Sequence, residues 1–130
     1  MQTLDRLDIA DLFARLARTL DEHRHDELDR VYHSDIAVHS PRGELRGLTE
    51  VTEFLNAQHT DLAQHVHSDI LIDVDGDRAT ATANQLVYFY REGEPPHRRS
   101  GLRLTTAAAR TADGWRFTEM GISPSWIQDA

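Results

Sequence analysis

The sequence predicts an α+β domain in which helices pack on one face of an antiparallel sheet. Two observations favour this class. Apolar residues recur at helical spacing early in the chain, whereas long alternating runs separated by tight turns fill the second half. The chain has 130 residues, of which 39% are hydrophobic, so we expect one domain with one core over residues 1–130.

The first part of the chain predicts three helices and one short strand. The first helix is expected over about residues 4–22. A second, short helix is expected over residues 26–33, followed by a strand at 36–39 that ends at the turn beginning with Pro41. Thr49 could cap the third helix. The apolar stripe of the first helix comprises Leu4, Leu7, Leu12, Phe13, Leu16 and Leu20.

The second half predicts four long strands, over residues 65–74, 78–90, 100–110 and 115–123. The turns between them contain Asp-Gly or Gly-Pro combinations, which are typical of tight reversals. Short turns between consecutive strands predict an antiparallel meander.

Composition excludes several classes of function. The chain has no cysteine, which rules out disulfides and thiolate metal sites. The net charge of −8 argues against a nucleic acid as partner. No apolar run is long enough to cross a membrane, and the N-terminal stretch lacks the basic region of a signal peptide. We therefore expect a cytoplasmic protein.

Histidines mark the first long strand. Strict alternation would place His65, His67 and Asp69 on one face and the apolar residues Val66 and Ile70 on the other. Such a strand could line a pocket. Two histidines two residues apart resemble the metal-binding pair of cupins, but the glutamate that follows in those proteins is missing. We therefore expect neither a metal nor another cofactor.

Asp21 continues the apolar stripe of the first helix, four residues after Ala17 and eight after Phe13. A carboxylate facing a core is costly unless it is paired or lines a wet cavity. One interpretation is a general acid/base partner of a histidine, with His65 as the first candidate. The alternative is that the helix ends earlier and Asp21 caps the next turn.

Tyr88 and Tyr90 share one face of the second long strand. A pair of tyrosines on a sheet face is typical of a subunit interface, although ordinary cross-strand packing would use them equally well. His39 ends the short strand and could point into the same pocket as His65.

The order of these segments resembles the nuclear-transport-factor-2-like superfamily, in particular its SnoaL-like branch, which includes scytalone dehydratase, ketosteroid isomerases and polyketide cyclases. The resemblance covers nearly the whole chain. It rests on LARTLDEHRHDELDRVYHSDIAVHS, on ELRGLTEVTEFL, on HVHSDILIDVDGDRATA and on RTADGWRF.

This resemblance implies a cone-shaped half-barrel, made of a strongly bent antiparallel sheet packed on three N-terminal helices, and commonly a homodimer. It also implies an acid/base pair of Asp21 and His65. The pocket tyrosine of relatives falls at His39. In the third long strand, threonine stands where relatives often keep a further acid. A second strand histidine of scytalone dehydratase has no counterpart near Asn84.

We therefore predict a cofactor-independent enzyme of the lyase or isomerase/cyclase type, acting on an apolar ring or polyketide-like small molecule. Asp21 and His65 would be catalytic, and His39, Asn84 or Tyr88 would bind the substrate oxygen. The alternative is a non-catalytic member of the same fold that binds a hydrophobic ligand or a protein.

Overall fold

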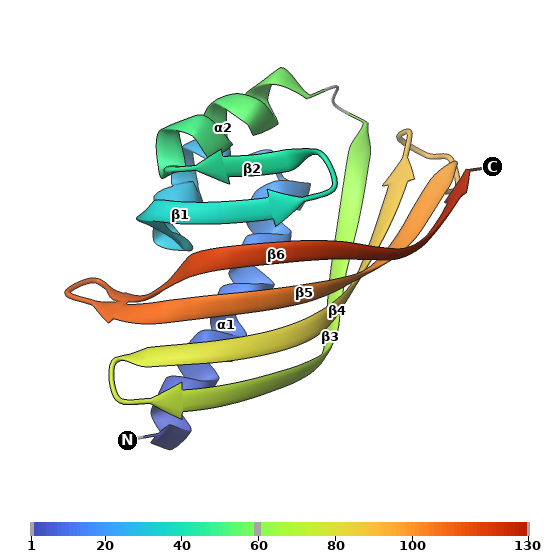
Figure 1. The fold of residues 1–130 in the computed structure, drawn as a ribbon. Coiled ribbons are helices and arrows are strands. Elements are labelled where there is room, and N and C mark those ends of the chain that lie inside the picture. Colours follow the sequence, from blue (N-terminus) through green and yellow to red (C-terminus); the bar gives the residue numbers. More distant parts are fainter. Residues whose placement is uncertain (1, 59–60, 130) are drawn as a thin grey trace.

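The computed structural model describes residues 2–58 and 61–129 and has the α+β architecture that the sequence predicts (Figure 1). Helices come first and long strands follow. The elements are α1 (Gln2–Asp21), η1 (His25–Arg30), β1 (Tyr32–Ser40), β2 (Gly43–Arg46), α2 (Leu48–Ala57), β3 (Leu62–Asp75), β4 (Arg78–Tyr90), β5 (Arg98–Thr111) and β6 (Gly114–Asp129).

The strands form one open six-stranded sheet in the order β2-β1-β6-β5-β4-β3. Figure 1 shows the long strands curving around α1, with α2 beside β1 and β2. Neighbouring strands are antiparallel except β1 and β6, which are parallel. The prediction of a wholly antiparallel sheet is therefore wrong at this one pairing. The chain leaves β1 through a hairpin and a helix and returns beside it only after three further strands, so no turn dictates the direction of β6.

The helices differ from the predicted ones mainly at their ends. In α1 the buried stripe includes Ile9 and Phe13, but Leu4 and Leu7 are 60% and 62% exposed. The predicted helix over residues 26–33 is a shorter 3₁₀ helix. The N-cap of α2 is Gly47 rather than Thr49. None of the helices in the described ranges is long and apolar enough to cross a membrane.

Several strands are longer than the sequence indicates, and β2 was not predicted. β1 begins at Tyr32 instead of residue 36, because the end of the predicted second helix is extended. The four residues of β2 pair with β1 across the Pro41 turn. Such a short hairpin arm, mostly exposed, has too little apolar alternation to be recognised from sequence.

A β-bulge in β3 exchanges the inward and outward faces of the part of the strand that follows it. The register with β4 shifts between Ser68 and Leu71, and Asp69 has a φ of 53°, which is the left-handed region. Before the bulge the histidines face inward and Val66 is 40% exposed, whereas after it Ile70 and Ile72 face inward. Strict alternation predicts the histidines and these isoleucines on opposite faces, and that prediction is wrong.

An ionic cluster around the buried Asp5 ties the start of α1 to the turns of the sheet. Asp5 is only 5% exposed, and Arg110 on β5 donates to both of its carboxylate oxygens, at 2.8 and 2.9 Å. The indole N–H of Trp115 lies 3.2 Å from the same carboxylate, and Arg110 also donates to Asp77, at 2.9 Å. The hydrogen bonds from Arg110 hold the pKa of Asp5 below its usual value. We call this end, where α1 begins, the narrow end of the molecule.

Candidate active site

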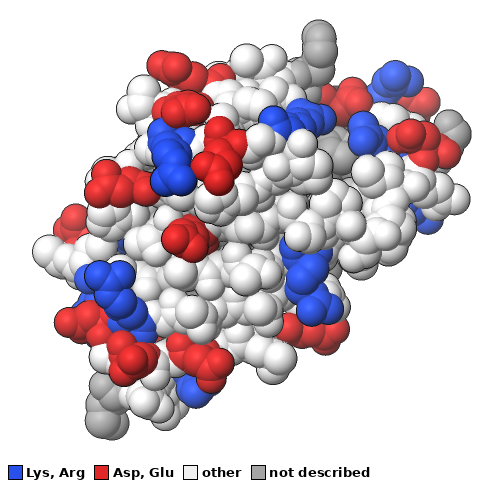
Figure 2. All heavy atoms as spheres, viewed as in Figure 1, with Lys and Arg blue, Asp and Glu red and all other residues white. Residues whose placement is uncertain are grey.

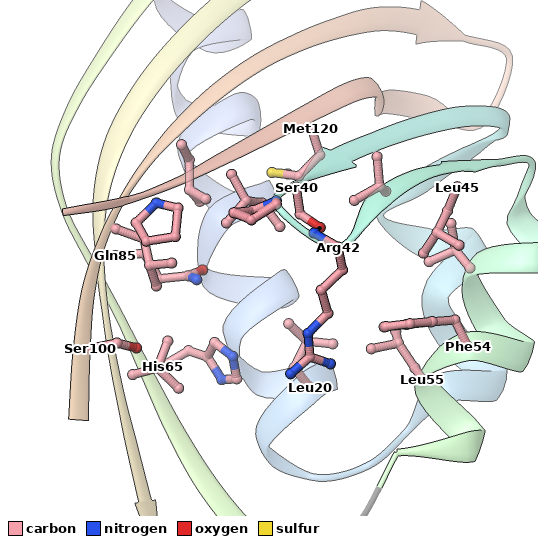
Figure 3. Close-up of a pocket in the computed structure, with 18 of the residues that line it drawn as sticks. Leu20, Ser40, Arg42, Leu45, Phe54, Leu55, His65, Gln85, Ser100 and Met120 are labelled. Carbon is pink, nitrogen blue, oxygen red and sulfur yellow. Dashed lines mark hydrogen bonds between the residues drawn. The ribbon is translucent and has the colours of Figure 1, made fainter. Parts of the chain in front are cut away.

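A cavity of about 430 Å³ lies between the concave face of the sheet, α1, α2 and the β1–β2 hairpin (Figure 3). Its wall is mostly apolar, with a few polar side chains, which is the usual composition of a small-molecule site. The polar and charged lining residues other than Tyr32 are Ser40, Arg42, Glu44, His65, Gln85, Arg98 and Ser100.

Asp21 and His65 meet at this cavity. Asp21 is the last residue of α1, and its Oδ1 lies 2.6 Å from Nδ1 of His65 and accepts the backbone N–H of His65 at 2.9 Å. The helix therefore continues to Asp21, which contacts the histidine strand instead of capping the next turn. The two side chains are only 23% and 14% exposed. The predicted contact between Asp21 and His65 is present.

The hydrogen bond fixes the form of the imidazole. A carboxylate only accepts, so in the neutral ring the proton is on Nδ1. This leaves Nε2 with its lone pair, and among the described residues Nε2 has no hydrogen-bond partner. Because His65 lines the cavity, this nitrogen is the basic atom available to a bound molecule.

His67 lies on the same face but is already bonded on both sides. Its Nδ1 is 2.9 Å from the carbonyl oxygen of Phe13, and its Nε2 is 2.8 Å from the side-chain amide of Gln85. Burial lowers its pKa, which favours the neutral ring. The ring therefore bridges the carbonyl oxygen of Phe13 and the side-chain oxygen Oε1 of Gln85. His67 thereby links α1, β3 and β4.

The three predicted substrate-binding residues do not line the cavity. His39 lies between Val38 and Ser40, which do, and its ring instead contacts Glu44 at 2.9 Å. Tyr88 lies between two lining residues of β4 and therefore faces the outer side of the sheet.

Asn84 also faces the outer side of the sheet. It donates to Asp69 at 2.8 Å and accepts from Arg103 at 2.9 Å. The bulge explains the placement of Asp69, which lies on the opposite face from the histidines. Within residues 2–58 and 61–129, no three histidine, aspartate or glutamate side chains are arranged to hold a metal ion.

Tyr32 and Gln85 are lining residues that the sequence did not single out. The sequence predicts Tyr32 on a helix, but it begins β1 and is 6% exposed, with its ring edge against Phe117. Its hydroxyl has no hydrogen-bond partner within the described part of the chain. Burial raises the pKa of Tyr32, so the phenol stays protonated and can donate. Gln85 lies two residues before Val87 on the same strand, so alternation would have placed both side chains on the inward face.

Comparison with solved structures finds the same fold in proteins of low sequence identity. A candidate scytalone dehydratase from Novosphingobium aromaticivorans matches with a TM-score of 0.88 and 18% identity, covering 99% of this chain and 89% of its own. A nuclear transport factor 2-like protein from Salmonella enterica matches at 0.86 and 17% identity, covering 95% and 93%. A hexachlorocyclohexane dehydrochlorinase, LinA type 2, matches at 0.85 and 15% identity, covering 98% and 93%.

At these identities the structural matches establish the fold, not the chemistry. No curated protein matches the sequence. The model of the SnoaL-like domain matches residues 1–121, which is nearly the whole chain. The chain thus belongs to the SnoaL-like family.

Proposed function

We propose that the protein is a cofactor-independent enzyme that removes a proton next to a carbonyl group of an apolar ring or polyketide-like molecule, with elimination, isomerisation or cyclisation following. One observation carries the proposal. Within the described residues, Nε2 of His65 has no hydrogen-bond partner and lies at an apolar cavity, while Nδ1 is held by the carboxylate of Asp21. A positioned base of this kind is what proton abstraction from carbon requires.

In the proposed step, Nε2 of His65 takes a proton from the carbon next to the carbonyl. The electrons of the broken C–H bond form a C=C bond, and the charge moves to the carbonyl oxygen. In an elimination the leaving group then departs with its bonding electrons, and Nε2–H of His65 can protonate it. Asp21 keeps the ring oriented and stabilises the imidazolium, because its carboxylate already accepts the Nδ1–H.

Tyr32 is the residue best placed to support charge on the substrate oxygen. It lines the same cavity as His65, stays protonated and has an uncommitted hydroxyl within the described residues. A donor aimed at a developing oxyanion typically contributes about 10²–10³ in rate. This role replaces the one predicted for His39, whose ring contacts Glu44 instead.

Two of the structural relatives favour eliminations among the candidate reactions. Their names describe a dehydratase and a dehydrochlorinase, and removal of water or of hydrogen chloride is in both cases an elimination. For this chain the resemblance supports a lyase ahead of an isomerase or cyclase.

The test measures exchange of carbon-bound hydrogen, which does not require knowing the product. The full chain is incubated in D₂O with 1-tetralone, 2-tetralone and related ring ketones, and deuterium incorporation is followed by mass spectrometry. We expect catalysed exchange with the wild type and none with His65→Ala. His97→Ala is the matched control, because His97 pairs with Asp61 and does not line the cavity. Saturable binding of the ketones without exchange would support the non-catalytic, ligand-binding alternative instead.

We also propose that two copies associate through the outer face of the sheet. Figure 2 shows this face, where charged side chains lie mostly toward the rim. Trp126 is 45% exposed there and packs over Gly101. A Cβ added at Gly101 would lie 2.3 Å from the indole nitrogen of Trp126. Exposed apolar area of this kind is typical of an interface. Its other members include Val66, Leu71, Leu86, Tyr88 and Tyr90.

A further inference from the structure

We infer that the ligand of the cavity is an amphipathic monoanion, an apolar body with one carboxylate, and that Arg42 binds the carboxylate. This inference deepens the proposed function in that it places the substrate in the same cavity. It does not depend on the acid/base role of His65.

Arg42 extends across the open end of the cavity. It lies in the turn between β1 and β2, where its backbone N–H donates to Ser40 Oγ at 3.2 Å. Figure 3 shows its side chain running from the hairpin into the space between His65 and Leu55. Its Nη1 donates to Gln58 Oε1 at 3.0 Å, directly after the end of α2. The guanidinium is therefore held at the cavity by both walls.

No described residue compensates the charge of Arg42 with an ion pair. Glu44, also in the lining, is paired with His39 at 2.9 Å and Arg46 at 3.1 Å, and Arg98 is paired with Asp129 at 3.4 Å. Within the described residues, Arg42 makes no ion pair, and its side chain bonds only the neutral amide of Gln58. A guanidinium has five N–H donors, so most of them remain available.

The chemistry of this group favours a carboxylate. The planar fork of arginine matches a carboxylate with two parallel hydrogen bonds. A phosphate monoester carries close to two charges at neutral pH and would face one unpaired cation beside the acidic Glu44. The cavity of about 430 Å³ accommodates a ring-sized apolar body beyond the carboxylate. Phe54 and Leu55 would cover that body, and its far end would reach toward His65.

The experiment compares two probes that share an uncharged body and differ only in the anionic group, 1-naphthaleneacetic acid and 1-naphthaleneacetamide. Their binding to the full chain is measured by isothermal titration calorimetry. We expect the wild type to prefer the acid about tenfold at low salt. This preference corresponds to about 1.4 kcal/mol, between the values typical of exposed ion pairs and of charge-assisted hydrogen bonds. Arg42→Gln should bind both probes equally, and Arg42→Lys should keep part of the preference.

Two further variants distinguish binding at Arg42 from a general effect of positive charge and from binding at His65. Arg91→Gln removes the same charge from an exposed loop outside the lining and should keep the full preference. The inference would be overturned if the wild type bound the acid and the amide equally or bound neither probe. It would also be overturned if the preference for the acid survived in Arg42→Gln. It would also be overturned if His65→Ala, and not Arg42→Gln, abolished the preference. Because no turnover is measured, loss of deuterium exchange and loss of this preference are independent results.

Discussion

Asp21 accepts two hydrogen bonds from one residue, the ring and the backbone N–H of His65. The backbone bond fixes the distance between the end of α1 and the strand, and the ring bond fixes the orientation of the imidazole. A single carboxylate therefore sets both the position and the tautomer of the candidate base. In the proposed function, this pair would serve proton transfer in addition to joining α1 to the sheet.

Asp21→Asn tests the charge of this pair without changing its shape. The amide oxygen can still accept from both N–H groups, so we expect the fold to be retained. The imidazolium formed during the reaction would lose its counter-charge, and kcat should fall by about 10²–10⁴. Steady-state kinetics on a substrate found by deuterium exchange, with circular dichroism as the folding control, checks this. An unchanged kcat would show that the carboxylate has no part in the reaction.

His67 makes stability depend on pH. Its folded pKa is lowered by burial, so the unfolded chain takes up a proton first as pH falls below roughly 6.5. The free energy of unfolding should therefore decrease as pH drops through that value and level off below the folded pKa. We expect a shallower dependence in His67→Gln and little change in the partly exposed control His97→Gln. Urea titrations between pH 7.5 and 5 measure this slope. Equal slopes in wild type and His67→Gln would contradict the prediction.

Among the elements, β3 shows most clearly what the sequence could and could not predict. The strand, its hairpin with β4 and the pairing of Asp21 with His65 follow from hydrophobic spacing and from the family resemblance. Strict alternation fails at Asp69, because one bulged residue exchanges the faces of everything beyond it. The residue type of Asp69 does not predict the bulge, since aspartate occurs both at the ends of regular strands and in left-handed positions.

Tertiary contacts account for the remaining differences from the predicted structure. The sequence does not show which face of β4 meets α1. Asn84 and Tyr88, which we predicted to bind the substrate, therefore turn out to face outward. The parallel pairing of β1 with β6 joins segments about eighty residues apart, which no local signal encodes. Arg42 is only a turn residue in the sequence, because its role at the cavity depends on the position of α2.

Asp69→Ala and Asp69→Gly form a matched pair that tests the bulge. Both remove the carboxylate that bonds Asn84, but only alanine carries a Cβ at a φ of 53°. We expect the alanine variant to be less stable than the glycine variant by about 1 kcal/mol, because the left-handed conformation is strained for residues with a side chain. Urea unfolding of the two variants gives this difference. An alanine variant as stable as the glycine variant would mean that the bulge relaxes to regular strand.

At the scale of the whole molecule, the proposed dimer can be tested with a single substitution that introduces a charge. Tyr88→Arg introduces a cation on the outer face of the sheet, where association would bury it without a partner. We expect sedimentation velocity to show a dimer for the wild type and a monomer for this variant. Gln2→Arg, an exposed change at the start of α1, is the control and should remain dimeric. A wild type that sediments as a monomer would exclude the proposed interface.

The ionic cluster around Asp5 has a consequence for how a ligand enters. At the narrow end, Arg110 joins α1, the β3–β4 turn and β5 through charged hydrogen bonds, so these segments separate only if several ion pairs break together. At the opposite end, the β1–β2 hairpin and α2 are joined across the cavity by a hydrogen bond from Arg42 to the uncharged amide of Gln58, which is not an ion pair. We therefore expect the molecule to widen more readily at the end where Arg42 lies. An anionic ligand that displaces Gln58 from that guanidinium would break this bond as it enters, so recognition and opening would be the same event.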